Sequence, residues 1–267
     1  MYKNVCKAVV VSGCVLFSQL SYATNDESTA EWKIDHDFFK QQVQQSMSAG
    51  RTVRTLIGHY PQSVTGIVDV ALDLYPEQYK EIIHSAVSAQ PYSAEDIVTI
   101  AVQKGITQCG SILEAAIRAE PSYVSFVATA AANASPEDFD DILRVAVMTE
   151  PDSADKIVQL MAKSYPEKIA EILSNTIKHV PLVGEYIVDA LLAVFPNKAE
   201  EVVSVAVRES SLQREQIQRI ISTALDAGVN VEDVTRFATM GGATLDEITA
   251  GVNSAPSQQD KQQIPQH

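Results

Sequence analysis

The stretch that decides the fold is PEDFDDILRVAVMTE, residues 136–150, which is followed at once by another proline, Pro151. It is one unit of a repeat, because proline recurs every fifteen residues through the middle of the chain. The period is missed once, where Ile106 stands in place of proline. A fixed period over this length indicates a repeat architecture, in which each unit buries its apolar side chains against its neighbours. The repeated prolines are Pro61, Pro76, Pro91, Pro121, Pro136, Pro151, Pro166, Pro181 and Pro196.

The apolar side chains of each unit have the spacing of an amphipathic helix. In the quoted unit they lie at positions 4, 7, 8, 11 and 12, as Phe139, Ile142, Leu143, Ala146 and Val147. This spacing predicts one helix of about ten to twelve residues per unit. A helix this short is marginal by itself, so it must be stabilised by its neighbours. Because only 6% of the chain is aromatic, we expect a thin core of Ala, Val, Ile and Leu.

The units alternate between two classes, which we call A and B. Position 4 is small in the A units, which begin at Pro61 and every thirty residues after it, and is bulkier on average in the B units between them. We expect Ser93 to cap its A helix, Pro136 to open its B helix, and a tight turn to alternate with a longer one. The sequence therefore predicts an all-α fold, an α-solenoid of about five thirty-residue αα-hairpins over 61–210. In architecture it resembles HEAT-type and tetratricopeptide arrays, although it lacks the thirty-four-residue tetratricopeptide period.

The segments that flank the array are expected to be atypical capping helices. Upstream, within 24–60, we predict one helix over 35–48 that ends at Gly50 and a second over 52–59. Downstream, within 211–252, we predict a helix stopped by Gly228, a second from Asn230 to Met240, and a third opened by Thr244. Residues 253–267 are rich in Ser, Pro and Gln, which predicts a disordered tail.

The N-terminus has the features of a secretory signal peptide over residues 1–23. Two lysines precede an uncharged, mostly apolar segment that ends in Ser21-Tyr22-Ala23, a small-x-small cleavage site. We predict cleavage after Ala23, with no stable membrane insertion afterwards, and a periplasmic or secreted mature protein. The alternative is a lipoprotein, because Val11-Ser12-Gly13-Cys14 matches a lipoprotein cleavage box with Cys14 as the lipidated residue.

Charge and cysteine content restrict the possible functions. Removing the leader takes away two lysines and no acid, so the formal net charge changes from −14 to −16. Such a charge argues against nucleic-acid binding and against an anionic membrane surface. Cys109 would be the one cysteine of the mature chain, which excludes an intramolecular disulfide. Its apolar position in the repeat favours a buried hydrophobic role over a reactive thiol.

No sequence motif indicates catalysis or a cofactor. Asp35-His36-Asp37 is the one tight cluster of His and carboxylates, and we interpret it as the start of a helix rather than a metal site. The sequence has no phosphate-binding Gly-rich loop, no nucleophile elbow and no zinc-type spacing. We therefore predict no catalytic residue, no metal and no cofactor.

Two sets of side chains are candidates for protein binding. Positions 5 and 6 of the B helices are mostly acidic, and stacking would align them into a strip that could attract a basic partner segment. Phe126 and Tyr186, at position 6 of A helices, should face outward. The bland interpretation of the acids is a solvated face, and that of the aromatics is packing against a neighbouring turn. The acids of this B strip are Glu81, Asp140, Asp141, Glu171, Glu200 and Glu201.

The function that these observations favour is an exported, non-enzymatic scaffold or adaptor that binds another protein. A long repetitive surface without a catalytic constellation motivates it. Two alternatives remain open. One is a hydrolase or lyase that acts on envelope polymers through carboxylates brought together by folding, and the other is a secreted effector.

Overall fold

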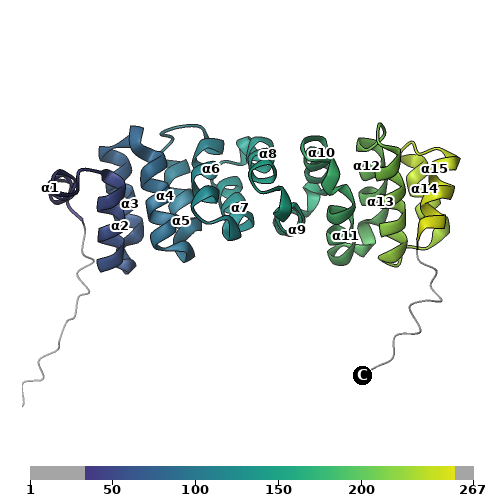
Figure 1. Cartoon of the computed structure of the whole chain (residues 1–267), viewed down its shortest axis with the longest axis horizontal. Helices are drawn as coiled ribbons and strands as arrows, with labels where there is room; N and C mark the ends of the chain where they lie inside the picture. Colours follow the sequence, from purple (N-terminus) through teal and green to yellow (C-terminus); the bar gives the residue numbers. More distant parts are fainter. Residues whose placement is uncertain (1–33, 256–267) are drawn as a thin grey trace, which may run out of the picture. The chain divides into compact units, whose positions relative to one another are not determined.

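The fold is all-α, as predicted. The computed structural model describes residues 34–255, which contain fifteen α-helices and no strand (Figure 1). The predicted signal peptide, Cys14 and residues 256–267 of the tail lie outside the described residues. Within the described part, no helix has both the length and the apolar character needed to cross a membrane.

The helices from α2 onward form two layers. Each helix packs against the helix two places along the chain, as well as against its sequence neighbours, and successive helices follow one another in a single stack (Figure 1). The A layer consists of α3 (Val64–Leu74), α5 (Ala94–Gln103), α7 (Val124–Ala134), α9 (Ala154–Ser164), α11 (Gly184–Val194), α13 (Arg214–Asp226) and α15 (Leu245–Ser254). The B layer consists of α2 (Ala49–His59), α4 (Tyr79–Ala89), α6 (Cys109–Ala119), α8 (Phe139–Thr149), α10 (Ile169–His179), α12 (Ala199–Glu209) and α14 (Val231–Met240). This arrangement confirms the predicted α-solenoid of paired helices.

The fifteen-residue period has a simple local origin. Each repeated proline opens a three-residue 3₁₀ turn that leads into an α-helix, which has eleven residues in every case except α5, with ten. One non-helical residue then completes a typical unit, as in Pro136–Asp138, Phe139–Thr149 and Glu150. Glu150 adopts φ −131° and ψ 72°, because a residue that precedes proline is excluded from the helical region. The proline itself lacks an N–H, so it is tolerated in the first turn, where that donor would be unsatisfied.

The predicted difference between the two turns was wrong. A and B units enter their helices through the same 3₁₀ turn, and the side chain of Ser93 makes no capping hydrogen bond. Residues Pro91–Ser93 already form a turn of 3₁₀ helix, and the α-helix begins directly after Ser93, at Ala94. In the unit that begins at Pro136, the preceding Ser135 donates a hydrogen bond from its Oγ to the Asp138 carboxylate at 2.8 Å.

The missed proline coincides with the break in this pattern. Without proline at position 106 no 3₁₀ turn precedes α6, and a short loop joins α5 to α6. Gly105 adopts φ +60° there, a conformation that strongly favours glycine. The backbone of Gln108 is extended before α6 begins at Cys109.

The core follows the predicted helical positions. Ile142 and Leu143, at the centre of the array, are both 0% exposed. Phe139, Ala146 and Val147 of the same unit are buried as well. Ala, Val, Ile and Leu make up most of the core, as the low aromatic content led us to expect.

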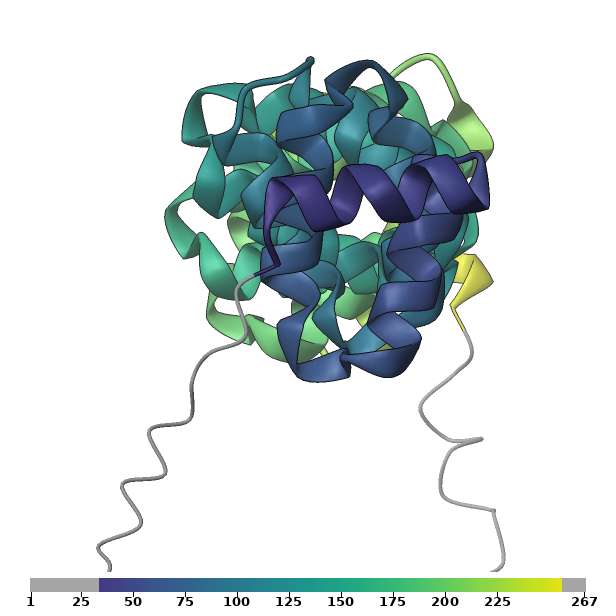
Figure 2. The same cartoon turned by 90° about the vertical axis from the view of Figure 1, so that its left-hand side faces the viewer.

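The N-terminal cap differs from the prediction at Gly50. Helix α1 (His36–Ser46) ends at Met47, which has φ +61°, and Ser48 caps α2 by accepting a hydrogen bond from the Arg51 N–H. Gly50 therefore lies inside α2 instead of ending α1. A Cβ at Gly50 would stand 2.5 Å from Cγ of Glu81, so this glycine permits α2 and α4 to approach closely. Figure 2 shows α1 lying across α2 and α3, which it contacts.

The C-terminal cap matches the prediction. Helix α13 is followed by Gly228 at φ +93°, and Asn230 caps α14. Thr244 opens α15 with a capping box, in which its hydroxyl accepts from the Glu247 N–H and Glu247 accepts from the Thr244 N–H. Helix α15 runs to Ser254, slightly past the predicted boundary.

Candidate protein-binding surface

The Asp35-His36-Asp37 cluster lies at the start of α1. Asp35 has the extended backbone of an N-cap residue and its carbonyl accepts from the Phe39 N–H, but its carboxylate makes no capping hydrogen bond. Among the described residues, no group of three or more His, Cys, Asp or Glu side chains is arranged to hold a metal ion.

Cys109 is a buried residue at the start of α6, with 6% of its surface exposed. Burial, together with the nearby carboxylates of Asp138, Asp141 and Glu137, raises the pKa of its thiol to about 12. Because the thiolate is the nucleophilic form, a thiol with this pKa is a poor nucleophile near neutral pH. The structure thus agrees with the interpretation of Cys109 as a small buried side chain.

The predicted B strip is largely paired within the chain. Asp140 accepts a hydrogen bond from Nδ2 of Asn175 at 3.0 Å, which links α8 to α10. Four more of its acids contact a cation or a hydroxyl. These pairs are Glu81 with Ser48, Asp141 with Arg144, Glu171 with Lys168 at 3.0 Å and Glu201 with Lys198 at 2.9 Å.

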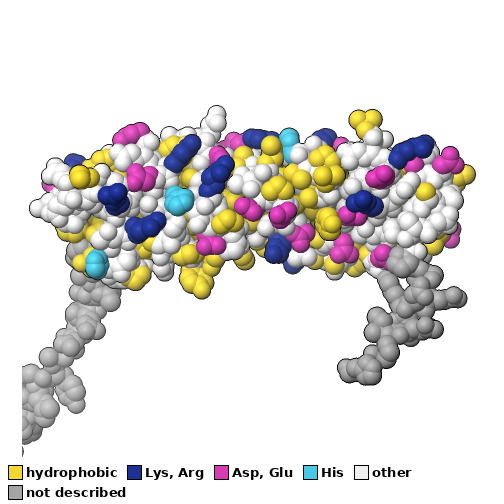
Figure 3. All heavy atoms as spheres, viewed as in Figure 1, with side chains coloured by type: hydrophobic (Ala, Val, Ile, Leu, Met, Phe, Trp, Pro, Cys, Tyr) yellow, Lys and Arg dark blue, Asp and Glu magenta, His cyan; other side chains and the backbone are white. Residues whose placement is uncertain are grey.

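Glu200 is the strip residue that makes no hydrogen bond or ion pair with the described residues. It is exposed and is one of the residues that line a hollow near the starts of α12 and α14. Lys and Arg side chains are interspersed with Asp and Glu on the face shown in Figure 3. Local ion pairs therefore offset much of the negative charge that a strip of uncompensated acids would carry.

The two predicted aromatics are exposed on the A layer. Phe126 is 45% exposed and Tyr186 is 62% exposed, so both face outward as position 6 predicted. The sequence analysis missed two further exposed side chains at position 2 of the A units, Tyr92 at 86% and Leu182 at 76%. Position 2 belongs to the 3₁₀ turn, which was not foreseen, and its side chain points away from the core.

These side chains lie at the N-terminal ends of A-layer helices. The Tyr123 ring joins α5 to α7, because it lies 6.2 Å from the ring of Tyr92 and 6.0 Å from that of Phe126. Helix α7 packs against α9, and α9 packs against α11. We call this set of side chains the A face and define it as Tyr92, Tyr123, Phe126, Pro151, Leu182, Val183 and Tyr186.

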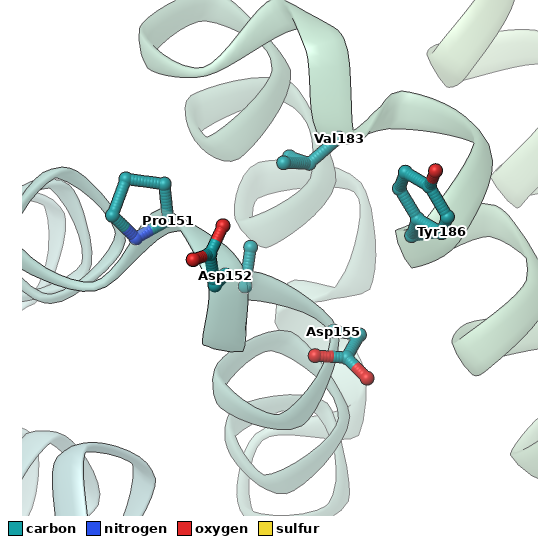
Figure 4. A pocket seen from close by; sticks show the side chains of 6 residues that line it. Pro151, Asp152, Asp155, Val183 and Tyr186 are labelled. Carbon is teal, nitrogen blue, oxygen red and sulfur yellow. The ribbon is translucent and has the colours of Figure 1, made fainter. Parts of the chain in front are cut away.

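A hollow of about 300 Å³ lies at one end of the A face, between α9 and α11. Figure 4 shows that Pro151, Asp152 and Asp155 line it from the start of α9, and that Val183 and Tyr186 line it from the start of α11. Ala154 completes the lining.

Asp152 and Asp155 make no hydrogen bond or ion pair with the described residues. The sequence analysis did not single out Asp152 or Asp155, and it missed that these two share a hollow with an exposed tyrosine. The chain matches no model of a known protein family, no curated protein and no solved structure.

Proposed function

We propose that this chain is an exported, non-enzymatic scaffold or adaptor, and that it binds another protein through the A face. The observation that carries the proposal is the exposure of Tyr92, Phe126, Leu182 and Tyr186 at the N-terminal ends of helices in one layer of a regular helical stack. Contiguous exposed apolar surface that is rimmed by polar residues is typical of protein interaction sites. Tyrosine is also one of the residue types enriched in binding hot spots.

The energetics favour a contact of this kind. Burying a large apolar side chain contributes roughly 1.5–3 kcal/mol. Tyr92 and Leu182 stand on turns whose conformation proline already restricts, and Phe126 and Tyr186 stand on the first turn of an α-helix. Little further ordering entropy is therefore lost on binding.

The B strip supports the proposal less strongly. Asp141, Glu171 and Glu201 each lie next to a Lys or Arg of their own helix or turn. A basic partner would have to compete with these intramolecular pairs, which are themselves worth less than about 1 kcal/mol when exposed. We retain the B strip as a second candidate surface, with Glu200 as its most accessible acid.

Site-specific photo-crosslinking distinguishes the two surfaces. A photoreactive phenylalanine analogue would be placed at Phe126, at Tyr186 or at Glu200 in the exporting cell, and crosslinked polypeptides would be identified by mass spectrometry. We expect the same partner from Phe126 and Tyr186, and less or none from Glu200.

The outcomes have clear meanings. Crosslinking from Glu200 alone would show that the partner binds the B strip and not the A face. The absence of any crosslinked protein from all three positions, in cells where the folded protein accumulates, would contradict the scaffold function. Turnover of peptidoglycan or polysaccharide fragments by the purified protein would instead support the hydrolase or lyase alternative.

A further inference from the structure

We propose that the hollow between α9 and α11 binds the side chain of an arginine presented by the partner protein. The inference rests on the proposed function, because it names the chemistry of the partner at one end of the A face. It is carried by the combination of apolar walls, two unpaired carboxylates and an exposed aromatic ring in one hollow.

The walls suit a long side chain with an apolar stem. Pro151, Ala154, Val183 and the Tyr186 ring present mostly carbon atoms to the hollow. At about 300 Å³ the hollow lies at the lower end of the range for small-molecule pockets, which fits one side chain better than a larger ligand. Long cationic side chains bury their methylene stems on such surfaces while the charged group reaches a polar partner.

The charge of the hollow selects a cation. Asp152 and Asp155 bring two negative charges and have no partner among the described residues. The dipole of α9 places about half a positive charge at its N-terminus, beside these carboxylates, so the net charge of the hollow remains negative. Lys156 follows Asp155 and is exposed, but in the described part of the chain it forms no ion pair with either carboxylate.

The aromatic ring favours arginine over lysine. Tyr186 is 62% exposed, and its ring borders the hollow opposite Asp152 in Figure 4. A guanidinium is planar, so it can stack on a ring while its N–H groups donate to a carboxylate. An ammonium is a compact, strongly hydrated charge, and it gains less from the same walls.

The test uses acetyl-Leu-Arg-Leu-amide as the probe, titrated into ¹⁵N-labelled mature protein at low salt. We expect amide shifts centred on Asp152, Asp155 and Tyr186. Replacing arginine by citrulline keeps the shape and removes the charge, and should weaken binding at least tenfold. Replacing it by lysine should weaken binding by a smaller factor.

Protein variants test the same contacts. We expect D152N/D155N to weaken binding at least tenfold, Y186L to weaken it several-fold and Y186F to leave it unchanged. The matched control E77Q/E167Q removes two exposed acids from the 3₁₀ turns that begin α4 and α10, and it should bind as the wild type does.

Three results would overturn the inference: equal affinity for the citrulline peptide, unchanged affinity in D152N/D155N, or shifts that map elsewhere. Loss of binding in the E77Q/E167Q control would also overturn the inference, because the affinity for the peptide would then depend only on the net charge of the protein. If Phe126 and Tyr186 still crosslink a partner while any of these holds, the protein-binding function stands and the arginine site does not.

Discussion

The ammonium of Lys104 lies 2.8 Å from the carboxylate of Asp69, so an ion pair ties the end of α5 to α3 where the proline period fails. Asp73 contacts the same ammonium, and the Lys104 side chain is only 17% exposed. Partial burial lowers the pKa of Lys104, but hydrogen bonds and attraction from Asp69 and Asp73 outweigh it and raise that pKa above 10.5.

Removing this ion pair should destabilise the array. We expect Lys104→Met to lower the free energy of unfolding by about 1 kcal/mol at pH 7, since both carboxylates are about half exposed and solvent screens them. Because the folded pKa is the higher one, the stabilisation is complete below the unfolded pKa and is lost as pH rises through the folded value. Urea denaturation should show a constant difference from pH 7 to 9 that narrows above about pH 10.5. Lys163→Met, an exposed change on α9, is the control.

Truncation of the central core should cost much more. Ile142→Ala and Leu143→Ala should each lower the free energy of unfolding by about 2–5 kcal/mol, because both side chains are fully buried between helices. Met148→Ala, on the same helix but 53% exposed, should change it by less than about 0.5 kcal/mol. Calorimetric melting of the three variants gives the comparison, and equal melting temperatures would contradict the helical register.

Two glycines should respond to alanine with opposite signs. Gly66 in α3 has open space where a Cβ would stand, so Gly66→Ala should stabilise the protein by roughly 0.5–1 kcal/mol through helix propensity. A Cβ at Gly251 in α15 would stand 2.8 Å from Cβ of Ile221, so Gly251→Ala should destabilise by about 1–3 kcal/mol. Chemical denaturation measures both, and a stabilised Gly251→Ala variant would show that α13 and α15 are not in close contact.

Cys109 should be unreactive in the folded protein. With a thiol pKa of about 12, the thiolate fraction at pH 8 is on the order of 10⁻⁴, compared with about a quarter for a free cysteine. We expect a disulfide reagent such as dithionitrobenzoate to label the folded mature protein at least a hundredfold more slowly than the urea-unfolded protein. Labelling at the unfolded rate would place the thiol in contact with solvent.

Export is tested at the N-terminus. Because Ser21-Tyr22-Ala23 closes the predicted leader, the mature chain should begin at Thr24. N-terminal sequencing and intact mass of protein purified from the producing cell measure this directly. A chain that begins at a lipid-modified Cys14 would show the lipoprotein alternative to be correct.

The sequence alone was sufficient to predict the helices and the core. Each fifteen-residue unit carries its own information, because the proline restricts its turn and the spacing of residues such as Phe139, Ile142 and Ala146 specifies a helix with one apolar face. The break at Ile106 and the cap at Thr244 were visible for the same reason, since both depend on neighbours within a few residues.

Only the tertiary structure decided which side chains meet between helices whose units lie thirty residues apart in the sequence. Position 5 of one B-layer helix packs against positions 6 and 10 of the next, as Gly50 does against Glu81 and Ser85, and as Gly110 does against Asp141 and Val145. That stacking register makes Gly50 a close-contact residue instead of a helix stop, and it lets Asn175 reach Asp140. On the A layer the same stacking brings the starts of α9 and α11 together, and the hollow arises there because its lining residues lie in two units that no local pattern connects.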